Sequence, residues 1–146
     1  MRISVTVALL LAACGGGSNL GTAAPVASSA QALREFMKAA ADSSISRMAE
    51  LWGTSHGPAG ATRNPADFEK RLILIQTYLR ADSTKVVSDI GVPGEEDQRR
   101  LQVAIYRMGC MKQVPALMLR LKNGGWIVNN IELASAGNPA RPCEES

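Results

Sequence analysis

The spacing of apolar residues changes near Ala81, and this change most constrains what the chain can fold into. Before Ala81 the apolar residues recur every three or four positions, which is the period of an amphipathic helix. A first helix is predicted from residue 28 or 29 onward, a second short helix over 45–52, and a third from Asn64-Pro65 onward. Residues 53–65 are rich in glycine and proline, which predicts a loop between the helices.

After Ala81 the apolar residues alternate with polar ones, which is the period of a strand with one buried face. Asn123-Gly124 separates the last two of these segments and predicts a tight hairpin turn. With the turn at this pair, Val114 is predicted to lie opposite Leu133. Helices followed by an antiparallel meander indicate an α+β fold class. The predicted strands cover residues 84–90, 99–106, 114–121 and 126–133.

Composition narrows the classes of function. A chain of 146 residues has room for one ordinary domain. The net charge is only +3, and its basic residues form no cluster larger than pairs such as Arg99-Arg100, which argues against a nucleic-acid partner. One histidine and three cysteines exclude most zinc sites, so neither a metal nor another cofactor is predicted.

The N-terminus, MRISVTVALLLAAC, has the features of a bacterial secretion signal: Arg2 precedes an eleven-residue apolar stretch over 3–13. This stretch is shorter than the roughly 20 residues that a spanning helix needs. Its end, Leu11-Ala12-Ala13-Cys14, resembles the lipobox, whose cysteine is lipidated and becomes the mature N-terminus. The resemblance implies a signal peptide over 1–13, a lipid anchor on Cys14 and an extracytoplasmic location on the cell envelope. Gly15 after the cysteine implies the outer membrane if the host is Gram-negative.

A flexible linker is predicted over 14–29, an α+β domain over 30–133 and an irregular tail over 134–146. The order of the helices and strands, with Gly124-Gly125-Trp126 at the entry of the last strand, resembles the nuclear-transport-factor-2-like superfamily. The resemblance implies helices packed against a curved antiparallel sheet, in a cone with an internal pocket. A cystatin-like or other α+β sheet domain is the second fold that this order allows.

Polar residues on the predicted strands would line such a pocket and orient a small ligand. Asn129 and Asn130 are neighbours, so they are expected to point to opposite faces of the sheet. The candidate ligand-pocket residues are Asp89, Tyr106, Asn129, Asn130 and Glu132.

No residue is predicted to be catalytic. His56 stands in the Gly/Pro-rich segment, with no nucleophile motif to complete a nucleophile–base pair. The chain also lacks the Asp, Tyr and protonated-Asp pattern of the isomerases in the superfamily that it resembles. The methionines Met108, Met111 and Met118 are of a type that binds soft metals, but their spacing favours packing in a core and a loop.

The leading expectation is a non-enzymatic lipoprotein that binds a small ligand or another envelope protein. A small pocket enzyme of hydrolase or isomerase type, using His56 or Asp89, is one alternative, and a structural or assembly lipoprotein is another. Residues 114–121 are apolar at successive positions, so both faces of this strand are expected to be covered. Helices on one face and a second copy on the other would do this, which allows a homodimer.

Cys110 and Cys143 are the two thiols that remain once Cys14 carries lipid. An oxidising compartment favours their pairing. The predicted register places Cys110 near the end of the sheet where the last strand leaves it. The ten residues 134–143 reach about 30 Å when extended, so a Cys110–Cys143 disulfide is predicted.

Overall fold

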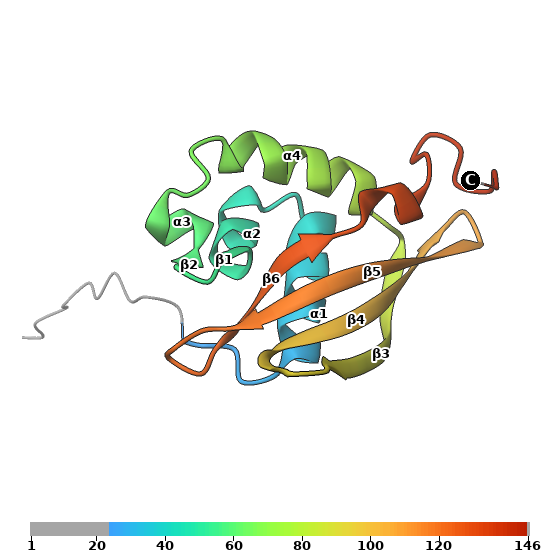
Figure 1. Ribbon diagram of the computed structural model, residues 1–146. Coiled ribbons are helices and arrows are strands. Elements are labelled where there is room, and N and C mark those ends of the chain that lie inside the picture. Colours follow the sequence, from blue (N-terminus) through green and yellow to red (C-terminus); the bar gives the residue numbers. More distant parts are fainter. Residues whose placement is uncertain (1–23, 146) are drawn as a thin grey trace, which may run out of the picture.

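The computed structural model describes residues 24–145, so the predicted signal peptide and Cys14 lie outside the described residues. It confirms the α+β class: helices come first in the chain, and an antiparallel sheet follows (Figure 1). The helices are α1 (Ser29–Ala41), α2 (Ile45–Leu51), α3 (Ala59–Thr62), α4 (Phe68–Leu79) and the 3-10 helix η1 (Leu133–Ala136). The strands are β1 (Gly53–Thr54), β2 (Gly57–Pro58), β3 (Ser83–Val92), β4 (Glu95–Arg107), β5 (Cys110–Arg120) and β6 (Trp126–Ile131).

Helix α1 begins where the sequence pattern predicts. The side chain of Ser28 accepts a hydrogen bond from the backbone N–H of Gln31, which satisfies one of the free donors of the first turn. Its apolar stripe, including Leu33 and Phe36, is fully buried against the sheet. Burial of this stripe, rather than helix propensity, supplies most of the stability of such a helix.

The prediction of a loop over 53–65 is wrong in part, because this segment contains the β1–β2 hairpin and the short helix α3. Two-residue strands and a four-residue helix are too short to leave a readable period in the sequence. Gly53 is required here, since a Cβ at this position would lie 2.2 Å from the carbonyl oxygen of Gly57.

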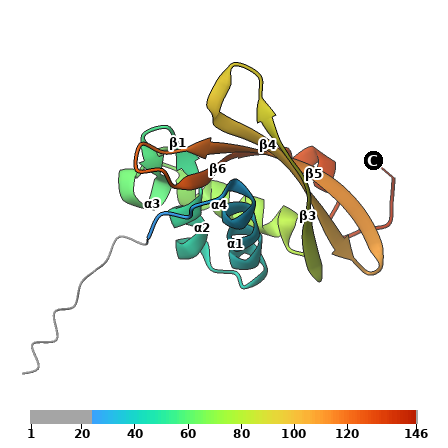
Figure 2. The ribbon, with the colours of Figure 1, turned by 90° about the horizontal axis from the view of Figure 1, so that it is seen from below.

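The main sheet has the strand order β3-β4-β5-β6, and every neighbouring pair is antiparallel. Trp52, the residue before β1, forms a parallel bridge with Val128, so the β1–β2 hairpin lies beside the edge strand β6. Helices α1, α2 and α4 lie on one side of the sheet, and the β3–β4 turn bends away from them (Figure 2). We call the side that faces away from α1 the outer face; it faces the viewer in Figure 1.

The predicted two-residue turn between β5 and β6 is wrong. Arg120 pairs with Trp126, and the turn spans Leu121 to Gly125, whose carbonyl accepts a hydrogen bond from the Leu121 N–H at 2.7 Å. A bulge in β6 then shifts the register by one residue. Beyond the bulge the predicted register holds, because the N–H of Glu132 bonds to the carbonyl of Pro115.

The space between the helices and the sheet is filled by side chains. Phe36 from α1, Leu101 from β4 and Met118 from β5 each have no exposed surface. Close packing of this kind is typical of a protein interior. The helix side of the sheet is therefore the core, and the outer face lies open.

The two ends of the described chain are fixed at opposite ends of the sheet (Figures 1 and 2). The end of the predicted linker is docked rather than free: the Val26 carbonyl accepts the N–H of Trp126 at 2.9 Å, beside the β5–β6 turn. At the other end, the structure contains the predicted disulfide between Cys110 and Cys143, with Cα atoms 5.4 Å apart. The tail over 134–146, which was predicted to be irregular, is not wholly so, because η1 extends into it as far as Ala136.

Arg107 connects the tail to helix α4. The residue is only 7% exposed, and its guanidinium donates hydrogen bonds to the carbonyls of Tyr78 and Ala136. Burial lowers the pKa of Arg107, and nearby Asp82 opposes this effect. A buried arginine that reaches two helix ends satisfies carbonyls that have no partner within their own helices.

Candidate functional site

The outer face of the sheet carries an open groove of about 600 Å³, which we call the outer groove. It crosses the strands β4, β5 and β6, so three neighbouring strands contribute side chains to it. The lining side chains include Arg100, Gln102, Pro115, Leu117, Asn130 and Glu132.

The strand register explains why these side chains meet. Arg100 pairs with Leu117, and Leu117 pairs with Asn130, so these three residues form one row across the sheet. Gln102 pairs with Pro115, which bonds to Glu132 in the next row on the same face. Residues two apart in a strand share a face, so the intervening residues turn to the core instead.

Two opposite charges lie at the ends of the outer groove. Arg100 and Glu132 are both exposed, and within residues 24–145 neither forms an ion pair. Strand β5 lies between them, so they are two strands and two residues apart. Standard strand spacings put their backbones about 12 Å apart. Both charges are therefore available to a bound molecule.

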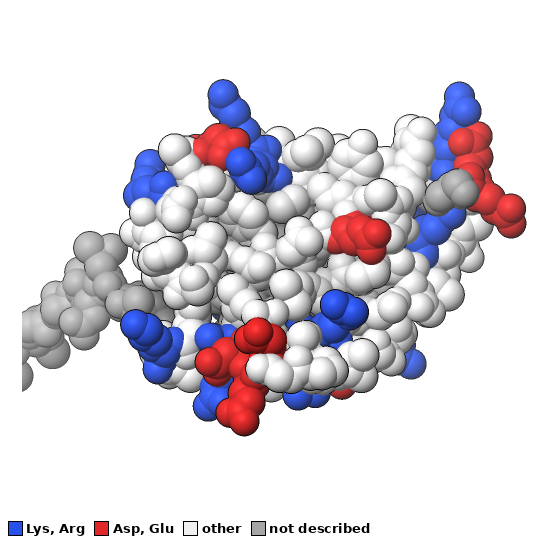
Figure 3. Space-filling model, in the orientation of Figure 1, with Lys and Arg blue, Asp and Glu red and all other residues white. Residues whose placement is uncertain are grey.

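The rest of the outer face is rich in apolar side chains. Ile90 is 57% exposed and Val87 is 43% exposed on the edge strand β3, and Leu117 and Pro115 are half-buried in the groove. Figure 3 shows this face with few charges at its centre and with acidic side chains gathered over the β3–β4 turn. An apolar area that is rimmed by charge is typical of a binding surface.

The structure brings two of the predicted ligand-pocket residues into the outer groove, Asn130 and Glu132. Tyr106 lies on the same face but near the β4–β5 turn, where it pairs with Met111. Sequence reasoning missed Arg100 and Gln102. The signal was present, because both alternate with the core residue Leu101 on the predicted strand.

Asp89 does not face the groove. Its carboxylate accepts a hydrogen bond from the hydroxyl of Ser29 at 2.8 Å and forms an ion pair with Arg99. These contacts connect the first residue of α1 to the strands β3 and β4. Asp89 therefore fastens the helix layer to the sheet.

Asn129 and Asn130 differ in position, because Asn130 lines the outer groove and Asn129 does not. Asn129 is the extra residue of the bulge, between Val128 and Asn130 in the register. Its side-chain amide donates to the carbonyl of Gly53 at 2.9 Å, which holds β1 against β6. Asn129 therefore does not line the groove.

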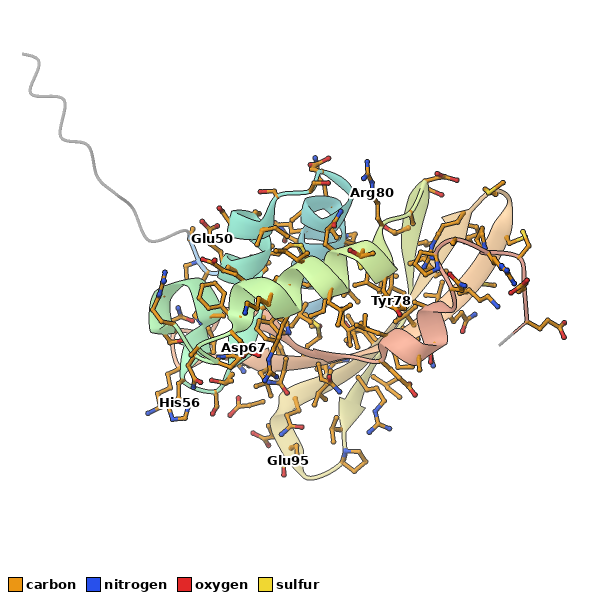
Figure 4. The ribbon with its side chains drawn as sticks, turned by 90° about the horizontal axis from the view of Figure 1, so that it is seen from above. Glu50, His56, Asp67, Tyr78, Arg80 and Glu95 are labelled. Atoms are coloured by element: carbon orange, nitrogen blue, oxygen red, sulfur yellow. A yellow bond between two sulfur atoms is a disulfide. The ribbon has the colours of Figure 1, made fainter. Side chains whose placement is uncertain are left out.

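His56 lies at the exposed β1–β2 turn, at the periphery of the molecule in Figure 4. Its Nδ1 atom is 3.5 Å from the hydroxyl oxygen of Thr54, within the same turn. A shallow pocket of about 270 Å³ beside it is also lined by Lys122 and Asn123. Glu95, the first residue of β4, is likewise peripheral, near the tip of the β3–β4 hairpin (Figure 4).

The three methionines considered for a soft metal do not meet. Met118 is buried in the core, whereas Met108 is 80% exposed at the β4–β5 turn. Among residues 24–145, no group of three or more His, Cys, Asp and Glu side chains is placed to hold a metal ion.

Comparison with known proteins adds no relative: no family model, no curated protein and no solved structure matches this chain. Over the described residues, none of the helices has the length and apolar character to span a membrane.

Proposed function

We propose that this chain is a membrane-anchored extracytoplasmic lipoprotein, held by Cys14, and that its α+β domain is a non-enzymatic binding module. The outer groove is the binding surface, and a small ligand or another envelope protein is its partner. The observation that carries this proposal is that Arg100 and Glu132 lie at the two ends of a groove with an apolar floor, on an open sheet face.

The chemistry of the groove supports binding rather than catalysis. Arg100 and Glu132 supply opposite charges, while Gln102 and Asn130 supply amide donors and acceptors. Asp89, which the enzyme alternative would use, is occupied by Ser29 and Arg99. A binding site of this kind needs a few well-placed polar groups around an apolar floor.

The cone of the nuclear-transport-factor-2-like superfamily is the fold that we propose for the domain. Two observations support this proposal. The sheet has helices on one face, and the bridge between Trp52 and Val128 places the segment that leads into the β1–β2 hairpin beside β6. Because side chains fill the core, the binding surface that we propose is on the outer face.

Site-specific photo-crosslinking on the full-length protein in its own membranes tests the binding surface. A photoreactive residue replaces Gln102 in the groove, and a matched control replaces Lys70, an exposed residue of α4 on the helix side. We expect a discrete crosslinked product from position 102 and none from position 70. Adding Arg100→Ala and Glu132→Ala should reduce the yield at position 102.

Equal crosslinking at both positions would contradict the assignment of the groove. Unchanged yield after both alanine substitutions would also contradict it, because the two charges would then have no part in binding.

A further inference from the structure

We infer that the partner of the outer face is a second copy of this chain, in a two-fold dimer in which Arg100 of each copy faces Glu132 of the other. The inference rests on the proposed function in one respect, because it takes the outer face to be the binding surface. It adds the identity of the partner and the residues that pair.

The first support is that the face is complementary to itself. Arg100 on β4 and Glu132 after β6 carry opposite charges with β5 between them, and within residues 24–145 neither forms an ion pair. Two such faces can meet about a two-fold axis that passes through the midpoint between the two charges and is perpendicular to the line that joins them. This rotation places the arginine of one copy over the glutamate of the other. Each arginine then lies opposite a glutamate, and the pairing occurs twice.

The second support is the apolar surface between and beside the charges. Leu117 and Pro115 lie between them, and Ile90 extends the apolar area onto β3. The axis passes over Leu117 and Pro115, so these residues would meet their own copies. Apolar contacts at the centre with charges toward the rim are the usual anatomy of a specific interface.

The third support comes from the position of the N-terminal segment. Strand spacings put Arg100 and Glu132 about 10 Å apart across the strands and about 7 Å apart along them. The exchanging axis therefore lies within about 35° of the strand direction, by the same geometry. Val26 is docked at one end of the strands, so a rotation about this axis leaves both N-terminal segments at the same end. Two copies anchored in one bilayer meet this condition.

Charge reversal in the full-length protein, purified from membranes in a mild detergent, tests the pairing. Sedimentation equilibrium compares wild type with Arg100→Glu, with Glu132→Arg and with the double variant. We expect a dimer for wild type and a dissociation constant at least about tenfold higher for each single variant, because each places like charges opposite one another twice. The double variant restores opposite charges and should return to within about threefold of wild type.

Lys70→Glu is the matched control, since it reverses an exposed charge on α4 and should leave the dissociation constant unchanged. Thermal unfolding of every variant is the control for folding, and each should unfold within a few degrees of wild type because the substitutions are at exposed sites.

A wild-type chain that stays monomeric at about 100 μM would overturn the inference. A dimer that the single reversals do not weaken, or that the double variant does not restore, would overturn it too. In the monomeric case, a crosslink from position 102 to a different protein would leave the proposed function intact, so the two failures are distinguishable.

Discussion

At the scale of single residues, Asp89 holds two layers of the molecule together. It accepts a hydrogen bond from the first residue of α1 and pairs with Arg99 on the neighbouring strand. Its side chain is about one-third exposed, so solvent weakens the ion pair but does not remove it. Its loss would leave Ser29, which is buried, without its partner.

Asp89→Ala should lower the free energy of unfolding by about 1–2 kcal/mol, because a buried hydroxyl loses its acceptor and Arg99 loses its carboxylate. Urea denaturation measures this change. Asp97→Ala is the control, since Asp97 is exposed near the β3–β4 turn and should change stability by less than about 0.5 kcal/mol. Equal effects of the two substitutions would show that Asp89 has no fastening role.

Residue type and position in a strand placed Asn130 and Glu132 among the candidate pocket residues, and both line the outer groove, but the contacts of Asp89 were not predicted. Which face a polar strand residue occupies depends on bulges, and β3 has an irregularity between Val86 and Ser88. A bulge of one residue moves every later side chain to the other face. Single-sequence periodicity does not reveal where that extra residue falls.

At the scale of elements, the docking of the N-terminal segment depends on one glycine. A Cβ on Gly125 would lie 2.8 Å from the Cβ of Pro25, closer than the two atoms can approach. The neighbouring N–H of Trp126 donates to Val26, so the backbones of the two segments lie side by side.

Gly125→Ala should displace Pro25 and break the bond between Trp126 and Val26. Hydrogen exchange of the Trp126 amide, followed by NMR, should then become at least about tenfold faster. Gly91→Ala is the matched control, because the nearest atom to its Cβ is a side-chain nitrogen of Arg99 at 3.9 Å. Unchanged exchange at Trp126 in Gly125→Ala would mean that the segment is not held by this contact.

The disulfide fixes the C-terminal tail to the first residue of β5. Replacing both Cys110 and Cys143 by serine should lower the free energy of unfolding by about 3–4 kcal/mol, the chain-entropy estimate for a loop of this size. The free energies of unfolding of the unreduced and the reduced wild-type protein, measured by chemical denaturation, should differ by a similar amount. Two free thiols in the unreduced, denatured wild-type protein would contradict the bridge.

The helices of about two turns or more and the strands of several residues were predicted from their periods, the short helix α2 among them, and the shortest elements were not. Helix α1 and strands β4 and β5 are long enough to show a repeat, whereas β1 and β2 have two residues each and α3 has four. The prediction of a two-residue turn between β5 and β6 was wrong for a different reason. Asn123-Gly124 favours a two-residue turn, but Gly125 joins a longer one, whose closing bond runs from Leu121 to Gly125.

At the scale of the whole molecule, the proposed attachment to the membrane depends on a single predicted modification, the lipidation of Cys14. Cys14→Ser should release the protein from the membrane fraction, because no acyl chain can then be joined to residue 14. Mass spectrometry of the membrane-extracted wild-type protein should show a chain that starts at Cys14 with added acyl mass. An unmodified Cys14, or cleavage at another residue, would contradict the anchor.

The fold class could be predicted from the sequence because the helices of the first half and the strands of the second half each have an apolar face. These faces are buried when the two layers pack against one another. The open outer face was less predictable. The apolar character of residues 114–121 predicts cover on both faces of β5, and the observed packing shows that the helices cover one of them.

The docked segment at Val26 has a mechanical consequence for a tethered domain. A pull from an anchor at Cys14 would load the bond between Val26 and Trp126 and the contact of Pro25 with Gly125 first. Peeling residues 24–27 away would add about 14 Å to the tether, and it would stop at Ser28, which caps α1. The height of the domain above the bilayer would then be adjustable in one step, with every helix and the sheet still folded.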